Sequence, residues 1–148
     1  MAINTGKVVV GWLAAGIVGN VLVFLLFGMW LGSKFEAEAV AAAPSLAGKG
    51  ATSFAMTMTI VSAFVVGFLL VWLYAAIRPR FGPGPKTAIY AALAVWILGF
   101  LFHLDLWILG LVTPATYIMA SVAALVQTTI SSVVGAMLYK EDTAAAAM

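Results

Sequence analysis

The sequence from Phe54 to Ile77, FAMTMTIVSAFVVGFLLVWLYAAI, runs for 24 residues without a charged side chain. A helix of about 20 residues crosses the roughly 30 Å hydrocarbon core of a bilayer, since each residue adds about 1.5 Å along the axis. This stretch therefore predicts a transmembrane helix. Three stretches of similar length and composition accompany it in the chain: Val8–Gly32, Ala88–Leu109 and Ala115–Tyr139.

The four stretches occupy most of the 148 residues. They predict an all-α integral membrane protein with one domain, a bundle of four transmembrane helices. The composition agrees, because 65% of the residues are hydrophobic and only 8% are charged, whereas ordinary soluble domains are about 25% charged. The first stretch exceeds the apolar region of a secretory signal peptide, which favours a retained helix over a cleaved one.

The distribution of lysine and arginine predicts the orientation of the chain. Four spans place the N-terminus, the second connection and the C-terminus on the same side of the membrane. Short segments rich in these residues stay in the cytoplasm, so we expect both termini to be cytoplasmic. That side holds Lys7, Arg78, Arg80, Lys86 and Lys140, and the other side holds Lys34 and Lys49.

The connections between the spans contain recognisable helix boundaries. Glu36–Ala43 is expected to form a short interfacial helix that ends before Pro44, because a proline disfavours helical geometry in the residue that precedes it. The segment Arg78–Lys86 holds three prolines and two glycines, which predicts the end of one helix and the start of the next. Thr113 is expected to cap the fourth helix, with Pro114 at its first position.

Small residues at four-residue spacing predict where the helices touch, because small side chains allow membrane helices to approach closely. The first and fourth spans carry the most regular series, so we expect these two spans to contact each other at the centre. The spacing leaves open whether further neighbours belong to the same chain. The members are Gly11, Ala15 and Gly19 in the first span, and Ala120, Ala124, Thr128, Ser132 and Ala136 in the fourth.

Asp105 and His103 are candidates for a proton or cation site, since an ionisable group within a span is costly and functional by default. Asp105 lies about 29 Å along the helix from Lys86 at 1.5 Å per residue, close to the far interface, which equally fits an anchoring role. The two side chains point to different faces of a helix. His103 is the only histidine and is also a candidate axial ligand for chlorophyll or haem.

Two amides lie in the middle of their spans. Buried amides need hydrogen-bond partners in hydrocarbon, and a bond between Asn20 and Gln127 across the bundle would satisfy both. The alternative is that they line a polar path together with nearby hydroxyls. Trp96 also lies deep in its span and is expected to face lipid or a neighbouring subunit.

Several classes of function are excluded by the composition. The chain has no cysteine, so cysteine-ligated zinc and iron–sulfur clusters are impossible. No other metal-ligand pattern is present, and a net charge of +2 is too small to favour nucleic acid as a partner. The basic turn with Arg78, Arg80 and Lys86 is a candidate surface for anionic lipid headgroups or a partner protein.

The segment Leu73–Ala88, LYAAIRPRFGPGPKTA, and the stretch Val8–Asn20 resemble a group of small bacterial four-span membrane proteins without an assigned function. The resemblance implies a multi-pass protein of the bacterial inner membrane and implies no chemistry. Two characterised four-span families differ from the chain. The small multidrug-resistance exporters carry a glutamate within the first span, and the glutathione-linked enzymes carry Glu, Arg, His and Asn within the second, where Phe54–Ile77 has none.

We therefore expect a non-catalytic accessory or scaffolding subunit of a larger respiratory or photosynthetic membrane complex, with lipids and other membrane subunits as partners. An enzyme is not expected, because no acid, base and nucleophile occur together. One alternative is a small transporter or channel with a path near Asn20, Gln127 and Asp105. Another is a pigment- or haem-binding module that uses His103; no other cofactor is predicted.

Overall fold

The computed structural model describes residues 3–139, so that residues 1–2 and 140–148, with the basic residue Lys140, lie outside the description. Every described element is helical, and four segments are long and apolar enough to cross a membrane: Thr5–Trp30, Ser53–Phe81, Pro85–Ile108 and Pro114–Leu138. The predicted all-α, four-span architecture is confirmed. The longer elements are α1 (Thr5–Val23), η1 (Phe24–Trp30), α2 (Gly32–Ala42), α3 (Ser53–Phe81), α4 (Pro85–Phe102), α5 (Leu104–Ile108) and α6 (Pro114–Leu138).

Most helix boundaries agree with the sequence. The short interfacial helix is α2, and Ala43 ahead of Pro44 has the extended geometry expected of that position (φ −144°, ψ 93°). The Thr113 side chain accepts a hydrogen bond from the Thr116 amide at the start of α6, as predicted. One boundary differs, because α3 continues beyond Ile77 and through Pro79 to Phe81. Gly82 follows it, with a φ of 83° that suits glycine. A proline in the last turn removes only one helical hydrogen bond.

Two spans that look continuous in sequence are interrupted in the structure. The first changes from an α-helix to the π-helix η1 over Phe24–Trp30, a rare local form that shifts the faces of the residues that follow. The third breaks at His103, which separates α4 from α5 with φ −97° and ψ 6°. Both interruptions lie in the half of the bundle that contains the site described below.

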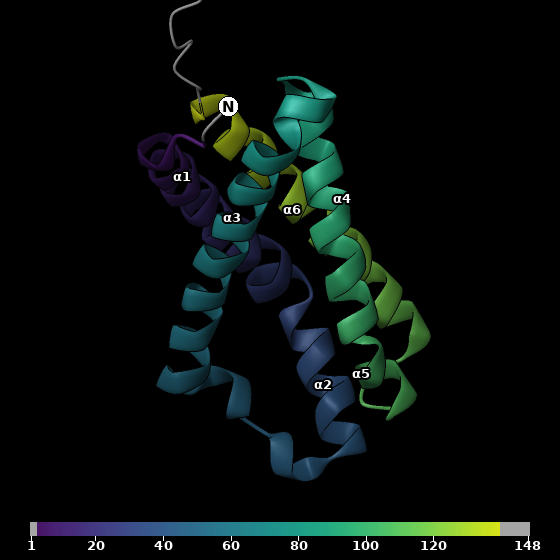
Figure 1. Cartoon of the computed structure of the whole chain (residues 1–148). Coiled ribbons are helices and arrows are strands. Elements are labelled where there is room, and N and C mark those ends of the chain that lie inside the picture. Colours follow the sequence, from purple (N-terminus) through teal and green to yellow (C-terminus); the bar gives the residue numbers. More distant parts are fainter. Residues whose placement is uncertain (1–2, 140–148) are drawn as a thin grey trace, which may run out of the picture.

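α1, α3 and α6 converge near the N-terminus and diverge toward the opposite end (Figure 1). Glycines permit the convergence: a Cβ atom added at Gly11 would lie 2.7 Å from the Gly135 carbonyl oxygen, and one added at Gly67 would lie 2.8 Å from the Gly16 nitrogen. α1 therefore packs against α6, as the small-residue series predicts. Its predicted packing residues Gly11, Ala15 and Gly19 are all buried.

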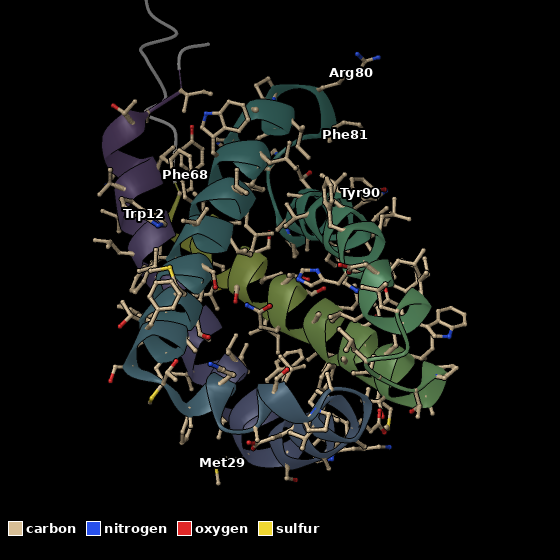
Figure 2. The ribbon with its side chains drawn as sticks, turned by 90° about the horizontal axis from the view of Figure 1, so that it is seen from below. Trp12, Met29, Phe68, Arg80, Phe81 and Tyr90 are labelled. Carbon is tan, nitrogen blue, oxygen red and sulfur yellow. The ribbon has the colours of Figure 1, made fainter. Side chains whose placement is uncertain are left out.

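Polar side chains reinforce this converging end. The Ser132 hydroxyl donates to the Ala88 carbonyl oxygen at 2.8 Å and joins α6 to α4. The Trp12 indole donates to the Phe64 carbonyl at 2.7 Å and joins α1 to α3, and the Trp12 ring meets Phe68 edge to face (Figure 2). The bilayer-facing helices are thus held by bonds to backbone carbonyls as well as by close packing.

At the opposite end one carboxylate joins α2 to the start of α6. Glu38 of α2 accepts hydrogen bonds from the Thr113 amide at 2.8 Å, the Thr113 hydroxyl at 3.2 Å and the Thr116 hydroxyl at 2.7 Å. The bond from the Thr113 amide is the largest reason that the pKa of Glu38 lies below 4.5, followed by the bond from the Thr116 hydroxyl. A negative charge is also favourable beside the N-terminus of α6.

Glu38→Gln is expected to loosen this contact, because a neutral amide presents N–H groups to donors that need an acceptor. The Thr113 amide should exchange its hydrogen faster, which hydrogen-exchange mass spectrometry can measure. Since the folded pKa is lowered, the carboxylate contributes its stabilisation above pH 4.5 and loses it as the pH falls through the folded pKa. The difference between variant and wild type should therefore disappear in acid.

Glu36→Gln is the matched control, since Glu36 accepts a bond only from the Gly48 amide of its own loop among the bonds in residues 3–139. Equal exchange at Thr113 in the Glu38→Gln variant and the wild type at neutral pH would contradict the proposed role of Glu38.

Candidate functional site

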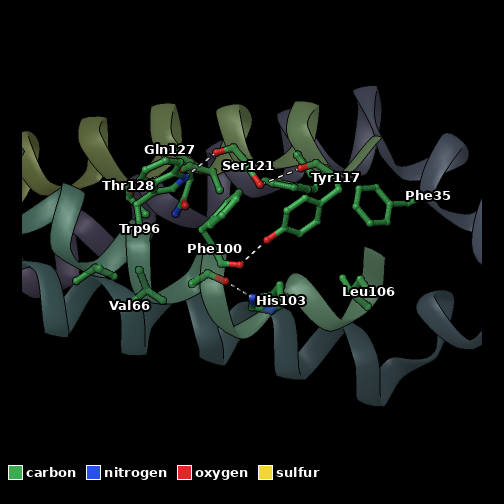
Figure 3. Close-up of a pocket in the computed structure, with 15 residues that line it drawn as sticks. Phe35, Val66, Trp96, Phe100, His103, Leu106, Tyr117, Ser121, Gln127 and Thr128 are labelled. Carbon is green, nitrogen blue, oxygen red and sulfur yellow. Dashed lines mark hydrogen bonds between the residues drawn. The ribbon is translucent and has the colours of Figure 1, made fainter. Parts of the chain in front are cut away.

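A cavity of about 490 Å³ lies in the diverging half of the bundle, between α4 and α6, with η1, α2, α3 and α5 completing its wall (Figure 3). Its wall is mainly apolar, and five aromatic rings contribute to it. These are Phe27 of η1, Phe35 of α2, Trp96 and Phe100 of α4, and Tyr117 of α6. Cavities that bind small molecules in proteins are typically 300–1,000 Å³ and have walls of this kind.

The space exists because small residues face each other across α4 and α6. Gly99 of α4 and Ala120 and Ala124 of α6 line the cavity, and an added Cβ at Gly99 would meet nothing within 4 Å. The small-residue series of the fourth span therefore has two roles. Ser132 meets α4 directly, whereas Ala124 and Thr128 border open space.

Most polar groups in the wall already have partners for their hydrogens. The Trp96 indole donates to the Ser121 carbonyl at 2.8 Å, and the Tyr117 hydroxyl donates to the Phe100 carbonyl. The Ser121 hydroxyl donates to the Tyr117 carbonyl at 2.9 Å, and the Thr128 hydroxyl to the Ala124 carbonyl at the same distance. The bonds of Trp96 and Tyr117 fix the register of α4 against α6, and all four bonds leave the hydrogens unavailable to a ligand.

His103 lies at the outer part of the cavity wall, at the break between α4 and α5. Its Nδ1 lies 2.8 Å from the Gly99 carbonyl oxygen, which accepts a hydrogen and so requires Nδ1 to carry one. In the neutral ring Nε2 is then left with a free lone pair. That nitrogen can accept a hydrogen bond or serve as an axial ligand.

Gln127 lines the inner part of the cavity and is 7% exposed. Its side chain has no hydrogen-bond partner within residues 3–139, and the hydroxyl oxygen of Ser131, one turn further along α6, is buried without one as well. Both polar groups flank Gly19, where an added Cβ would lie 3.2 Å from Gln127 Nε2 and 3.4 Å from Ser131 Oγ. The inner end of the cavity therefore holds one unpartnered amide, and an unpartnered hydroxyl lies beside it in the interface between α1 and α6.

The expected bond between Asn20 and Gln127 is not formed. Asn20 Nδ2 instead donates to the Gly16 carbonyl at 2.9 Å and the Ile60 carbonyl at 3.4 Å, which satisfies it within α1 and α3. Asp105 is exposed on α5 and accepts a bond from the Leu106 amide at 3.0 Å. Neither Asn20 nor Asp105 lines the cavity, so the structure does not join the three residues of the expected path.

The basic turn lies at the converging end, away from the cavity. Arg80 is exposed and points away from the bundle (Figure 2). Arg78 is instead half-buried, with its guanidinium 5.7 Å from the centre of the Tyr139 ring. The Lys86 ammonium lies 5.9 Å from the Tyr90 ring, so two of the three cations contact aromatic rings of the protein itself.

Charged side chains are absent from the cavity wall. The residues that line the cavity include no lysine, arginine, aspartate or glutamate. Within residues 3–139 there is also no group of three or more His, Asp or Glu side chains that would hold a metal ion. An ion placed here would lack a counter-charge, so the cavity is suited to an uncharged molecule.

Sequence reasoning identified His103, Gln127, Ala124 and Thr128 but did not place them in one site. It was wrong about Trp96, which is half-buried and bonded to α6 because its indole N–H needs an acceptor in hydrocarbon. The signal that could have found the cavity is the antiparallel pairing of α4 with α6, which brings Gly99 opposite the alanines of α6. That pairing depends on how α4 and α6 are aligned along their axes, and the sequence of a single span does not specify this alignment.

The chain matches no known protein-family model, and neither a curated protein nor a solved structure is significantly similar to it.

Proposed function

We propose that this protein is a membrane subunit that binds one uncharged lipophilic molecule taken from the bilayer. The observation that carries the proposal is the cavity between α4 and α6, with its aromatic wall and the unpartnered Gln127 amide. Its volume is in the range of ligand sites. A wall without charged groups favours a neutral occupant, because an unpaired charge is costly away from water.

Purified protein should carry about one extracted lipophile per chain if the proposal is correct. Solvent extraction followed by mass spectrometry measures the amount and identity, and an absorption spectrum identifies a pigment or haem bound through His103. Protein that carries no lipophile and takes none up from added lipid would contradict the proposal. The matched comparison is extraction from an Ala124→Phe variant, in which a phenylalanine ring would fill part of the cavity.

A second candidate function is the accessory role in a larger membrane complex. It is favoured by the first turns of α3, where residues 53–62 contain no buried side chain and diverge from the other spans (Figure 1). Phe54 is 72% exposed and Met56 59%. Such a helical segment offers its whole circumference to another membrane protein. Recovery of the chain alone after mild native purification would contradict this role.

We further propose that the protein resides in a bacterial inner membrane with both termini in the cytoplasm. The bacterial assignment is supported by the resemblance of Leu73–Ala88 to bacterial four-span proteins, and the orientation by the basic side that includes Arg80. Since the chain has no cysteine, single cysteines at Arg80 and Lys49 can report the two sides. A membrane-impermeant thiol reagent should label intact cells only at position 49.

A further inference from the structure

The polar groups of the cavity define the chemistry of its ligand, if the proposed function holds. Four of the polar side chains in the wall donate their hydrogens to backbone carbonyls, at Trp96, Tyr117, Ser121 and Thr128. Gln127 is the exception at the inner end, where its amide has no partner within residues 3–139 although it is 93% buried. An amide in that position is costly unless a ligand or water supplies a partner.

Ser131 supplies the second observation. Its hydroxyl oxygen is buried without a partner, and residues four apart on a helix are neighbours. The contacts of Gly19 place the Gln127 amide and the Ser131 hydroxyl at the same point of the interface between α1 and α6. Neither group is bonded to the other, so the polar inner end of the cavity is bordered by a second unpartnered group in the interface between α1 and α6.

We propose that Gln127 donates a hydrogen bond to a carbonyl oxygen of an uncharged lipophile that reaches the inner end of the cavity. The unpartnered amide N–H requires an acceptor oxygen, and the uncharged wall excludes a carboxylate. The class of membrane molecule that this selects is a neutral carbonyl compound with an apolar tail, such as a prenylated or alkylated quinone.

The position of His103 gives the ligand a direction. The bonds from Trp96 to Ser121 and from Ser132 to Ala88 show that α4 and α6 are antiparallel. Gln127 then lies opposite Ala91 or Ala92, about 17 Å along the axis from His103 at roughly 1.5 Å per residue. A carbonyl-bearing ring at Gln127 would therefore send its tail toward His103 and the outer opening, past Phe100 and Tyr117.

The test compares a carbonyl ligand with an apolar one of similar length. Decylubiquinone binding to the full-length protein is measured by quenching of tryptophan fluorescence, and decylbenzene binding by competition. Wild type is expected to bind decylubiquinone about tenfold more tightly, the usual scale of one neutral hydrogen bond. Gln127→Leu should remove the preference and retain decylbenzene binding, which also reports that the cavity is folded. Ser131→Ala should keep the preference, because the Ser131 hydroxyl does not line the cavity.

Ser121→Ala is the matched control, because the Ser121 hydroxyl lines the cavity but already donates to the Tyr117 carbonyl. It should keep the wild-type preference. Equal binding of both probes by wild type, or a preference that survives in Gln127→Leu, would overturn this inference and leave the proposed function intact. Failure of the wild-type protein to bind either probe would overturn the proposed function itself.

Discussion

Ala124→Phe is expected to abolish ligand binding, with a loss of affinity on the order of 100-fold, or about 2.7 kcal/mol. Ala124 lies in the wall of the cavity on α6, and a phenylalanine ring at this position would fill space that a ligand needs. The neighbouring wall cannot withdraw easily, since Trp96 and Tyr117 are fixed by hydrogen bonds across the two helices. Lipophile content after extraction and decylubiquinone affinity both measure the effect.

The matched control for that prediction is Ala94→Phe, the same substitution on the exposed surface of α4. It should leave both lipophile content and decylubiquinone affinity at the wild-type level. If the two variants retained equal amounts of ligand, the molecule would be bound elsewhere and the cavity would not be the functional site.

Gly135→Ala is expected to destabilise the bundle by about 2 kcal/mol, the usual size of an overpacking effect. An added Cβ would overlap Val71 Cγ2, and it would lie 3.0 Å from the Gly11 carbonyl oxygen and 3.1 Å from Ala15 Cβ. Three helices meet at this point, so no single neighbour can move without disturbing the other two. Thermal unfolding in detergent, followed by circular dichroism, measures the loss.

Gly99→Ala provides the comparison within another span. An added Cβ there would meet nothing within 4 Å, and alanine favours a helix over glycine by roughly 0.5–1 kcal/mol. The two substitutions should therefore shift the melting temperature in opposite directions. A melting temperature for Gly135→Ala at or above that of wild type would contradict the close packing of α1, α3 and α6.

The architecture could be predicted because each span carries its own signal. A run such as Phe54–Ile77 specifies a membrane helix locally, and Thr113 followed by Pro114 specifies where the last helix starts. The boundaries at Phe81 and His103 were missed, since a proline within a helix and a break in an apolar run depend on how neighbouring helices pack. Local patterns do not contain that information.

The site was harder to predict for the same reason. Gln127 stood out as a polar residue in an apolar span, but its expected partner Asn20 bonds to the Gly16 carbonyl instead. Trp96 looked like a lipid-facing residue, because nothing in its own span identifies the Ser121 carbonyl as an acceptor. The partners of buried polar groups lie on other helices, so their identity follows only from the three-dimensional register.

The bond between Glu38 and Thr113 has a consequence for the order in which the chain folds. It joins residues 75 positions apart, and contacts of such long separation form late, after much of the chain has already been ordered. During synthesis Glu38 leaves the ribosome long before its partner exists. The Thr113 amide, which precedes the first residue of α6, therefore remains without this acceptor until the first three spans and the start of the fourth have been made, which makes the contact a marker of late assembly.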